Sequence, residues 1–337
     1  MSGRGSTITG LGRAIPSRVL TNADLERMVE TTDEWIVTRT GIRERRIAAE
    51  GQTTSDLAYE AAREALAQAQ VEADQLDLII VGTATPDMPF PATACLLQDR
   101  LGATRAGAFD AAAACTSWMY GVAMGHGYIV AGLAETVLVV GAETLSRITN
   151  FKDRATSVLF GDSAAATVLQ PAPEGSGFLS FVLGSDGSGG SLLSIPAGGS
   201  RAPASFETVE RAQHFIQMNG REVYKFAVRM IPRAIQEAAA RAGIPLEEVD
   251  FFIPHQANIR IIDAAAQRLG APREKFFVNV ERYGNTSSAS VPVALYEAWA
   301  EGRIAPGDLG VLVAFGGGLT WGACALRWTK AAPESAT

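Results

Sequence analysis

Three short segments of this chain offer a thiol, an imidazole and a carboxamide at places where an apolar, strand-like run gives way to a loop or a helix. They are Ala113-Ala114-Cys115, Pro254–Asn258 with His255, and Gly284–Ser287 with Asn285. In α/β folds, reactive groups are commonly presented at such strand ends. A thiol can carry an acyl group, and neutral N–H donors stabilise an enolate or carbanion beside it. The segments therefore predict acyl chemistry on sulfur.

Cys115 follows the strand-like run Gly107–Asp110 and precedes an apolar helical pattern. The N-terminus of a helix carries partial positive charge and free N–H groups, which should lower the pKa of the thiol and hold an oxyanion. The alternative for a lone cysteine is a buried and unreactive side chain. The glycines Gly316–Gly318 similarly predict either a close backbone approach to a ligand or a flexible turn.

His255 is one of three histidines. His126 lies in a helical Gly/Ala/Met pattern typical of packing, and His214 lies in a mixed, partly exposed segment. The polar neighbours of His255 have no evident role in the fold, which favours a site there, although a structural histidine is the alternative. Asn285 could belong to an ordinary turn followed by a helix N-cap.

The overall composition restricts the classes of function. The 337 residues are 47% hydrophobic and 19% charged, with a formal net charge of −7, a pI of about 5.2 and a mean hydropathy of +0.11. An acidic chain of this kind predicts no nucleic-acid or anionic-membrane partner. Three cysteines without metal-ligand spacing, and an N-terminus without an apolar signal region, predict a cytoplasmic protein with no metal.

Helical patterns alternate with short apolar runs, which predicts a largely parallel or mixed sheet covered by helices. Strands are expected at Leu78–Gly82, Thr136–Gly141, Ala164–Leu169, Phe251–Ile253, Phe276–Val280 and Gly310–Phe315. Helices are expected at Asn22–Glu30, Ser55–Gln68, Thr116–Ala131, Arg221–Ala242, Ile259–Leu269 and Ser288–Glu301. Pro232 should kink or split the fourth helix. The Gly/Ser/Pro-rich stretch Gly184–Ser205 is expected to be a surface loop joining two halves.

A weak internal repeat supports a duplicated unit. The segments Glu64–Asp77 and Glu237–Asp250 are similar, and Val137–Gly141 aligns loosely with Leu312–Gly316. The alternative is that any two alanine-rich helices look alike.

Taken together, these motifs resemble the β-ketoacyl-acyl-carrier-protein synthase III family, the initiating condensing enzymes of type II fatty acid synthesis. The resemblance runs from about Thr7 to Trp328 and is carried by Thr21–Leu25, Asp33–Ile42, the three reactive segments, Phe160-Gly161-Asp162 and Phe315–Gly322. It implies a thiolase-like fold with α-β-α-β-α layers and two mixed five-stranded sheets related by a pseudo-dyad. It also implies a homodimer and two halves, residues 1–172 and 173–337.

The resemblance also implies roles for individual residues. Cys115 would take a short acyl group from acyl-CoA, and His255 and Asn285 would stabilise the carbanion formed when malonyl-acyl-carrier-protein loses CO2. The acyl-enzyme carbonyl would be held by the N–H groups of Cys115 and Gly317, without a cofactor. The remaining positions are Trp35, Arg39, Arg154 and Asn258 for CoA, Leu145, Phe160, Phe315 and the partner-derived Phe90 for the acyl pocket, and Lys225, Arg260 and Arg268 for the carrier protein.

Other interpretations of these motifs remain. Elongating condensing enzymes use a second histidine where this chain has Asn285, and thiolases use a second cysteine where it has Val313–Phe315. A same-fold acyltransferase or ketosynthase of specialised, polyketide-type metabolism is the alternative function, and a non-catalytic acyl-CoA-binding paralogue is a further one. The segment Thr116-Ser117-Trp118 departs from the family pattern and leaves the preferred starter acyl group open.

Overall fold

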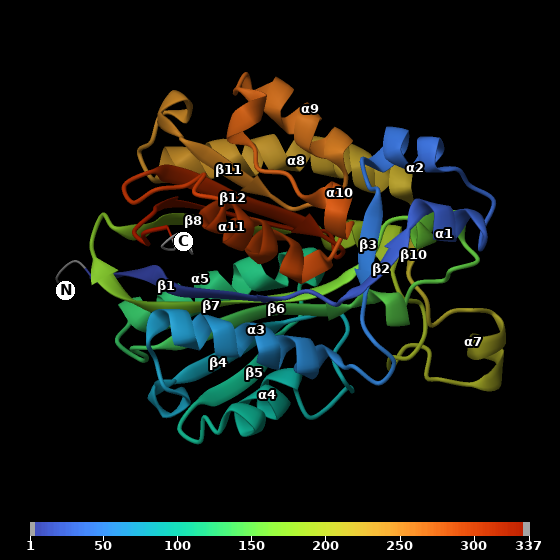
Figure 1. The fold of residues 1–337 in the computed structure, drawn as a ribbon, viewed down its shortest axis with the longest axis horizontal. Helices are drawn as coiled ribbons and strands as arrows, with labels where there is room; N and C mark the ends of the chain where they lie inside the picture. Colours follow the sequence, from blue (N-terminus) through green and yellow to red (C-terminus); the bar gives the residue numbers. More distant parts are fainter. Residues whose placement is uncertain (1–3, 333–337) are drawn as a thin grey trace.

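A computed structural model describes residues 4–332 and arranges them in five layers (Figure 1). Two β-sheets lie face to face across a central layer of helices, and a further pair of helices covers the outer face of each sheet. The layering is the predicted α-β-α-β-α order. Within the described residues, no helix combines the length and the apolarity needed to span a bilayer.

The first sheet has five strands and comes from the N-terminal half. Their order is β1 (Arg4–Ala14), β7 (Asp162–Pro173), β6 (Val137–Thr144), β4 (Leu78–Gly82) and β5 (Gly107–Ala111). β4 runs parallel to both β5 and β6, whereas β7 is antiparallel to β1 and β6. The alanine-rich helix α3 (Thr54–Ala69) and α4 (Thr93–Leu101) cover its outer face.

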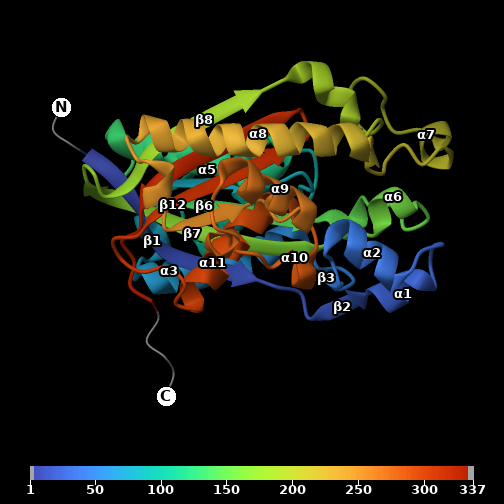
Figure 2. The same ribbon diagram turned by 90° about the horizontal axis from the view of Figure 1, so that it is seen from above.

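The second sheet repeats this plan with one strand fewer. Its order is β11 (Phe251–Pro254), β12 (Leu309–Gly316), β13 (Thr320–Arg327) and β8 (Gly177–Ser185), with α8 (Gly220–Arg241) and α9 (Ile259–Leu269) on the outside (Figures 1 and 2). A strand was expected at Phe276–Val280. Only a single parallel bridge, between Phe252 and Phe276, occupies that place, and Val280 already begins the short helix α10 (Val280–Tyr283). The prediction of two five-stranded sheets is therefore wrong for the second sheet.

The central layer consists of α5 (Ser117–Val130), which is about half buried, and α11 (Ser290–Ala300), which is largely buried. Each is preceded by one turn of 3-10 helix, η2 (Ala114–Thr116) and η7 (Ser287–Ala289). Gly121 allows α5 to approach the first sheet, because a Cβ there would lie 2.8 Å from the Val139 side chain. The two helices bring the segments that contain Cys115 and Asn285 into the middle of the molecule.

Helix α8 runs unbroken through Pro232, so the helix is not split there. Proline removes the N–H that would bond to the carbonyl four residues earlier. Here that carbonyl belongs to Val228, and it accepts a hydrogen bond of 2.9 Å from Nη1 of Arg268 on α9. The neighbouring helix thus supplies the donor that the proline lacks.

Smaller elements gather at one end of the sandwich, on the right in Figure 1. They are β2 (Arg18–Thr21), α1 (Asn22–Glu26), α2 (Asp33–Thr40), β3 (Glu44–Ile47), α6 (Arg154–Ser157), β9 (Leu193–Ser194), α7 (Phe206–Glu210) and β10 (Gln217–Met218). β9 pairs with β10, so part of the stretch Gly184–Ser205 is structured and does not form only a surface loop. The functional cavities open at this end.

Candidate active site

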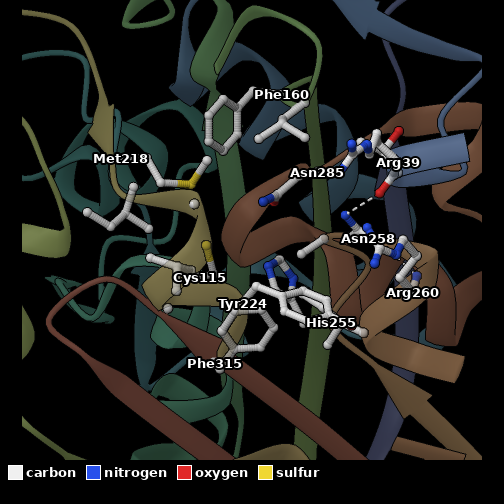
Figure 3. A pocket seen from close by; sticks show the side chains of 18 of the residues that line it. Arg39, Cys115, Phe160, Met218, Tyr224, His255, Asn258, Arg260, Asn285 and Phe315 are labelled. Atoms are coloured by element: carbon white, nitrogen blue, oxygen red, sulfur yellow. Dashed lines mark hydrogen bonds between the residues drawn. The ribbon is translucent and has the colours of Figure 1, made fainter. Parts of the chain in front are cut away.

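Cys115, His255 and Asn285 line one cavity of about 430 Å³, and Figure 3 shows their side chains directed toward a common space. Cys115 comes from η2 in the first half, His255 follows β11, and Asn285 follows α10. The three residues are separated by up to 170 positions in the sequence, so the packing of the two halves creates the site.

The turn that carries Cys115 is held by its own hydroxyl groups. The N–H of Ala113 donates to Oγ of Ser117 (2.8 Å), and that hydroxyl donates to the carbonyl of Ala114 (2.7 Å). Ala114 adopts a left-handed φ of +48°. From the other half, Gly316 lies so close that a Cβ would come within 2.7 Å of the Cys115 nitrogen. These contacts fix the direction of the thiol.

Burial dominates the ionisation of the thiol. It raises the pKa of Cys115 to about 12, and the negative charge of Glu143 acts in the same direction, while the polar hydroxyl of Ser287, which lines a cavity with Cys115, opposes them. The expected lowering of the pKa by the α5 N-terminus is therefore not the net effect. Burial therefore favours the protonated thiol, whose proton must leave when sulfur acts as a nucleophile.

His255 is buried and neutral. Its Nδ1 forms a short hydrogen bond with Oγ of Ser290, which also accepts from the N–H of Gln256 (3.4 Å). In the tautomer in which the Ser290 hydroxyl donates to Nδ1, the ring proton lies on Nε2. Burial lowers the pKa of His255 to about 3. The ring also packs edge-on against Phe315, with centroids 5.2 Å apart. His255 is thus built as a neutral donor.

The amide of Asn285 is oriented by its own turn. Its Oδ1 accepts from the N–H of Ser287 at 2.8 Å, which leaves the NH2 group as the end available to the cavity. Backbone bonds to Leu159 (2.8 Å) and from Gly161 (3.0 Å) anchor the residue to the first half. Two neutral donors, from His255 and Asn285, therefore face the space in front of the sulfur.

The mouth of the cavity carries an aromatic ring among cations. The guanidinium groups of Arg39 and Arg154 lie 6.0 and 5.0 Å from the centre of the Trp35 ring. Trp35 and Arg39 line the cavity, whereas Arg154 does not line it and donates to the carbonyl of Glu30 (3.2 Å). Asn258 lines the cavity too, but its Nδ2 already donates to the carbonyl of Arg39 (2.9 Å; Figure 3).

The three residues predicted to face the carrier protein have different environments. Lys225 is exposed on α8 and pairs with Glu222 at 2.7 Å. Arg260 lines the mouth and lies 5.5 Å from the Tyr224 ring centre. Arg268 is exposed but tied to the α8 backbone beside Pro232. Arg260 is therefore the member of this set that joins the outer face to the cavity.

A second cavity of about 180 Å³ adjoins the first and shares Cys115, Phe160 and Leu193 with it. The predicted pocket residues Leu145 and Phe160 line it, as does Gly317. Phe315 lines only the first cavity, and Phe90 lines neither and is 84% exposed. Trp118 is buried in the central core and does not line this pocket.

Sequence reasoning missed several apolar residues of this second cavity. They are Ile148, Leu193, Ile195 and Ile216. Two of them belong to the Gly/Ser/Pro-rich stretch, where a short apolar run, Leu192-Leu193-Ser194-Ile195, was the available signal. Among residues 4–332, no group of three or more His, Cys, Asp or Glu side chains could hold a metal ion.

Comparisons with known proteins point to one family. Residues 109–187 match the 3-oxoacyl-[acyl-carrier-protein] synthase III family, and residues 239–328 match its C-terminal region. The β-ketoacyl-[acyl-carrier-protein] synthase III of Symbiobacterium thermophilum is 60% identical and that of Desulfitobacterium hafniense 55% identical. Each of these alignments covers 96% of this chain and 98% of the relative.

Solved structures are similar over the same span. The synthase III from Thermus thermophilus is 50% identical with a TM-score of 0.89, covering 96% of this chain and 100% of that one. The priming β-ketosynthase of the R1128 polyketide pathway is 34% identical with a TM-score of 0.90, covering 98% of both chains. The fold is thus the thiolase-like fold of these condensing enzymes.

Proposed function

The chain belongs to the β-ketoacyl-[acyl-carrier-protein] synthase III family, and from that premise we propose that Cys115, His255 and Asn285 carry its reaction. The enzyme is an acyltransferase that initiates fatty acid biosynthesis. It condenses a short acyl-CoA with malonyl-acyl-carrier-protein and forms 3-oxoacyl-acyl-carrier-protein, CoA and CO2. The observation that carries the assignment is the shared cavity, in which one thiol faces two neutral N–H donors.

In the first half-reaction, Sγ of Cys115 attacks the carbonyl carbon of acyl-CoA. The N–H groups of Cys115 and Gly317 hold the oxyanion, and the CoA sulfur leaves. The acyl chain then occupies the smaller cavity between Leu145 and Phe160. Trp35, with Arg39 and Arg154 beside it, holds the nucleotide of CoA at the mouth, since an aromatic face flanked by guanidinium groups suits adenine and phosphate. Asn258 keeps Arg39 in place for this contact.

In the second half-reaction, malonyl-acyl-carrier-protein loses CO2. Negative charge develops on its thioester oxygen, and Nε2–H of His255 and Nδ2–H of Asn285 stabilise it. Each such donor contributes about 3 kcal/mol in a site without water. The carbanion attacks the acyl carbonyl, and the sulfur of Cys115 leaves. Thioesters supply the activated groups, so we propose that no resident cofactor takes part.

The partners follow from the surface. We propose that acyl carrier protein docks over Arg260 and Lys225 beside the mouth, because its acidic helices complement them. Arg268 would contribute less, since its guanidinium already serves the α8 backbone. We further propose a homodimer, in which the 84% exposed Phe90 enters the acyl pocket of the second copy. The few free cysteines are consistent with a reducing cytoplasm.

A second candidate is a starter enzyme of polyketide-type metabolism. It is favoured by the 34% identity to a priming β-ketosynthase over 98% of the chain. The two differ in the acyl group selected and in the carrier protein that accepts it. The fatty acid role has the greater support, because relatives of 52–60% identity carry the synthase III name.

The test measures each half-reaction on the purified protein. A panel of short acyl-CoAs is scored by intact-protein mass, and the acyl-enzyme is then mixed with malonyl-carrier protein. We expect one acyl group on Cys115, followed by release of CO2 and a 3-oxoacyl product. Cys115→Ala should remove all labelling. Persistent labelling on Cys95 or Cys324 would show that the nucleophile is misassigned, and acylation without condensation would favour a different acceptor.

A further inference from the structure

A buried carboxylate on α11 has no part in the two half-reactions described above. Glu297 is only 4% exposed and lines neither cavity of the site. Its Oε1 accepts from the hydroxyl of Tyr283 (2.6 Å) and, in a short ion pair, from Nη1 of Arg13 on β1. Its Oε2 accepts from Nδ2 of Asn279 (2.8 Å) and from Nη2 of Arg282 (2.9 Å). Four side chains thus converge on one carboxylate inside the protein.

Three of these four donors lie in α10 or directly before it, and α10 has only four residues. A helix of this length is not stable by itself, so contacts of its side chains must fix its place. Tyr283 is its last residue, and Asn285 follows after a single glycine. The hydrogen bonds to Glu297 therefore fix the backbone from which the amide of Asn285 projects.

The same carboxylate is connected to the loop of the imidazole. Asn279, whose side chain donates to Glu297, uses its backbone N–H to bind Oε1 of Gln256 (3.1 Å). Gln256 is 1% exposed and directly follows His255. Its Nε2 donates to the carbonyl of Pro254 (2.8 Å), the residue before His255. A continuous chain of hydrogen bonds thus runs from Glu297 to the backbone on both sides of the imidazole.

Helix α11 makes a second contact with this imidazole. Ser290, the partner of Nδ1 of His255, lies seven residues before Glu297 on α11. Seven residues are about two helical turns, so both side chains lie on the same face of α11. One helix therefore holds His255 through Ser290 and the segment before Asn285 through Glu297.

We propose that Glu297 is a positioning residue that keeps His255 and Asn285 at the separation required to bind one thioester oxygen. Both N–H groups must reach that oxygen at about 2.7–3.1 Å, and a displacement of about 1 Å can cost about 10²-fold in rate. The ion pair with Arg13 ties the same carboxylate to the first half, which carries Cys115. This inference rests on the proposed roles of His255 and Asn285.

The first test removes one accepting oxygen without changing the size of the side chain. In Glu297→Gln, either orientation of the new amide turns an NH2 group toward two of the four donors. At saturating malonyl-carrier protein, decarboxylation by the acyl-enzyme should slow by about 10²-fold. Acylation of Cys115, and KM for malonyl-carrier protein, should each stay within about threefold of the wild type. Equal losses in both half-reactions, as expected for a purely structural role, or wild-type decarboxylation would overturn the proposal.

A rescue variant tests whether the hydrogen bond itself matters. Combining Glu297→Gln with Asn279→Asp exchanges the amide and the carboxylate, so that the new amide can donate to the new carboxylate and still accept from Tyr283. The double variant should decarboxylate at least about tenfold faster than either single variant, because each single change leaves two like groups facing each other. Additive losses in the double variant would contradict the proposal.

Tyr283→Phe is a milder variant for the case in which Glu297→Gln does not fold, as judged by thermal melting. It removes one of the four hydrogen bonds and leaves the charges in place. Decarboxylation should slow by about tenfold, with acylation unchanged. Wild-type decarboxylation in this folded variant would count against the proposal.

Glu64 on α3 provides the matched control. Its carboxylate also joins α11 to the first half, since it accepts from the hydroxyl of Tyr296 and from the N–H of Arg13 (2.8 Å). Within residues 4–332, no hydrogen bond joins Glu64 to α10 or to the His255 loop. Glu64→Gln should leave both half-reactions within about threefold of the wild type. A selective loss of decarboxylation as large as that in Glu297→Gln would overturn the proposal.

The wild-type enzyme separates this inference from the proposed function. If its acyl-enzyme does not decarboxylate malonyl-carrier protein, the proposed function itself fails. If the wild type is active and Glu297→Gln is equally fast, only the positioning role fails.

Discussion

Two turns in the central layer have nearly the same backbone and very different chemistry. In the first half, Ala114 (φ +48°) precedes Cys115, and in the second half Ser287 (φ +49°) precedes Ser288. Each turn begins a short 3-10 helix that leads into a central α-helix, α5 or α11. A glycine at or near the end of the opposite central strand makes room for each turn: Gly316 for the first and Gly141 for the second.

The two turns differ in what their side chains face. Cys115 opens onto two cavities and two neutral donors. The hydroxyl of Ser288 instead lies between the carbonyl of Gly82 (2.7 Å) and the carboxyl group of Glu143 (2.8 Å), which compete for its one proton, away from both cavities. The repeated fold thus supplies two equivalent positions for a reactive side chain, and the space in front of each decides which of them can meet a substrate. This correspondence supports our proposal that the chain divides into related halves near residue 172.

The largest expected effect comes from replacing Cys115 of the first turn by serine, the residue at the equivalent position of the second turn. Cys115→Ser should reduce acyl-enzyme formation by more than about 10³-fold, because a hydroxyl is a far weaker nucleophile than a thiol without a strong base. Intact-protein mass after incubation with acyl-CoA measures the change. Acylation within tenfold of the wild type would show that position, and not sulfur, decides the reactivity.

Removing one of the two N–H donors that face Cys115 should have the next largest effect. His255→Ala should slow decarboxylation of malonyl-carrier protein by about 10²- to 10³-fold, as for loss of one oxyanion donor. Acylation of Cys115 should stay within a few-fold of the wild type, because His255 takes no proton in that step. Release of CO2 from preformed acyl-enzyme, compared with the acylation rate, tests the division. Equal losses in both steps would contradict it.

The two glycines offer a matched pair of variants. Gly141→Ala and Gly316→Ala both push a methyl group against a turn, and each should cost about 1–3 kcal/mol of unfolding free energy. Only Gly316→Ala should also slow acylation, because it displaces the backbone of Cys115. Denaturant titration and acylation of the folded protein measure the two effects. A Gly141→Ala enzyme that loses as much acylation would show that the turns are mechanically coupled.

Acidification should change the free energy of unfolding in opposite directions through His255, near the first turn, and Glu143, near the second. The pKa of His255 falls to about 3 in the folded state, so between pH 6.5 and 3 the unfolded chain binds a proton that the folded protein does not. The free energy of unfolding therefore falls by about 1.4 kcal/mol per pH unit as the pH drops from 6.5 toward 3. Burial raises the pKa of Glu143, so acidification through the interval above its ordinary value favours the folded state. Denaturation at pH 7 and 4.5 should therefore show less acid destabilisation in His255→Gln than in the wild type, and more in Glu143→Gln. The reverse pattern would mean that these groups are not buried as described.

The sequence predicted the elements with strong periodicity. Helix α9 and strand β4 begin and end at the predicted residues, and α5 and α8 lie within one residue of their predicted bounds at either end. Strands β1 and β8 were missed, because glycine and polar residues obscure their alternation. The continuity of α8 through Pro232 could not be predicted, because a single chain segment does not reveal that Arg268 can serve the carbonyl of Val228.

Residue types and their local context were enough to single out a thiol, an imidazole and a carboxamide, and their motifs identified the family. Tertiary structure alone decided how these groups are tuned. Burial sets the pKa of Cys115 and His255, and both depend on packing between the two halves. Ser290 orients the imidazole across 35 positions, and the backbone of Asn285 binds Leu159 and Gly161 of the other half. Such contacts join residues far apart in the chain, so no local pattern of amino acids encodes them, and only the folded arrangement brings them into hydrogen-bond range.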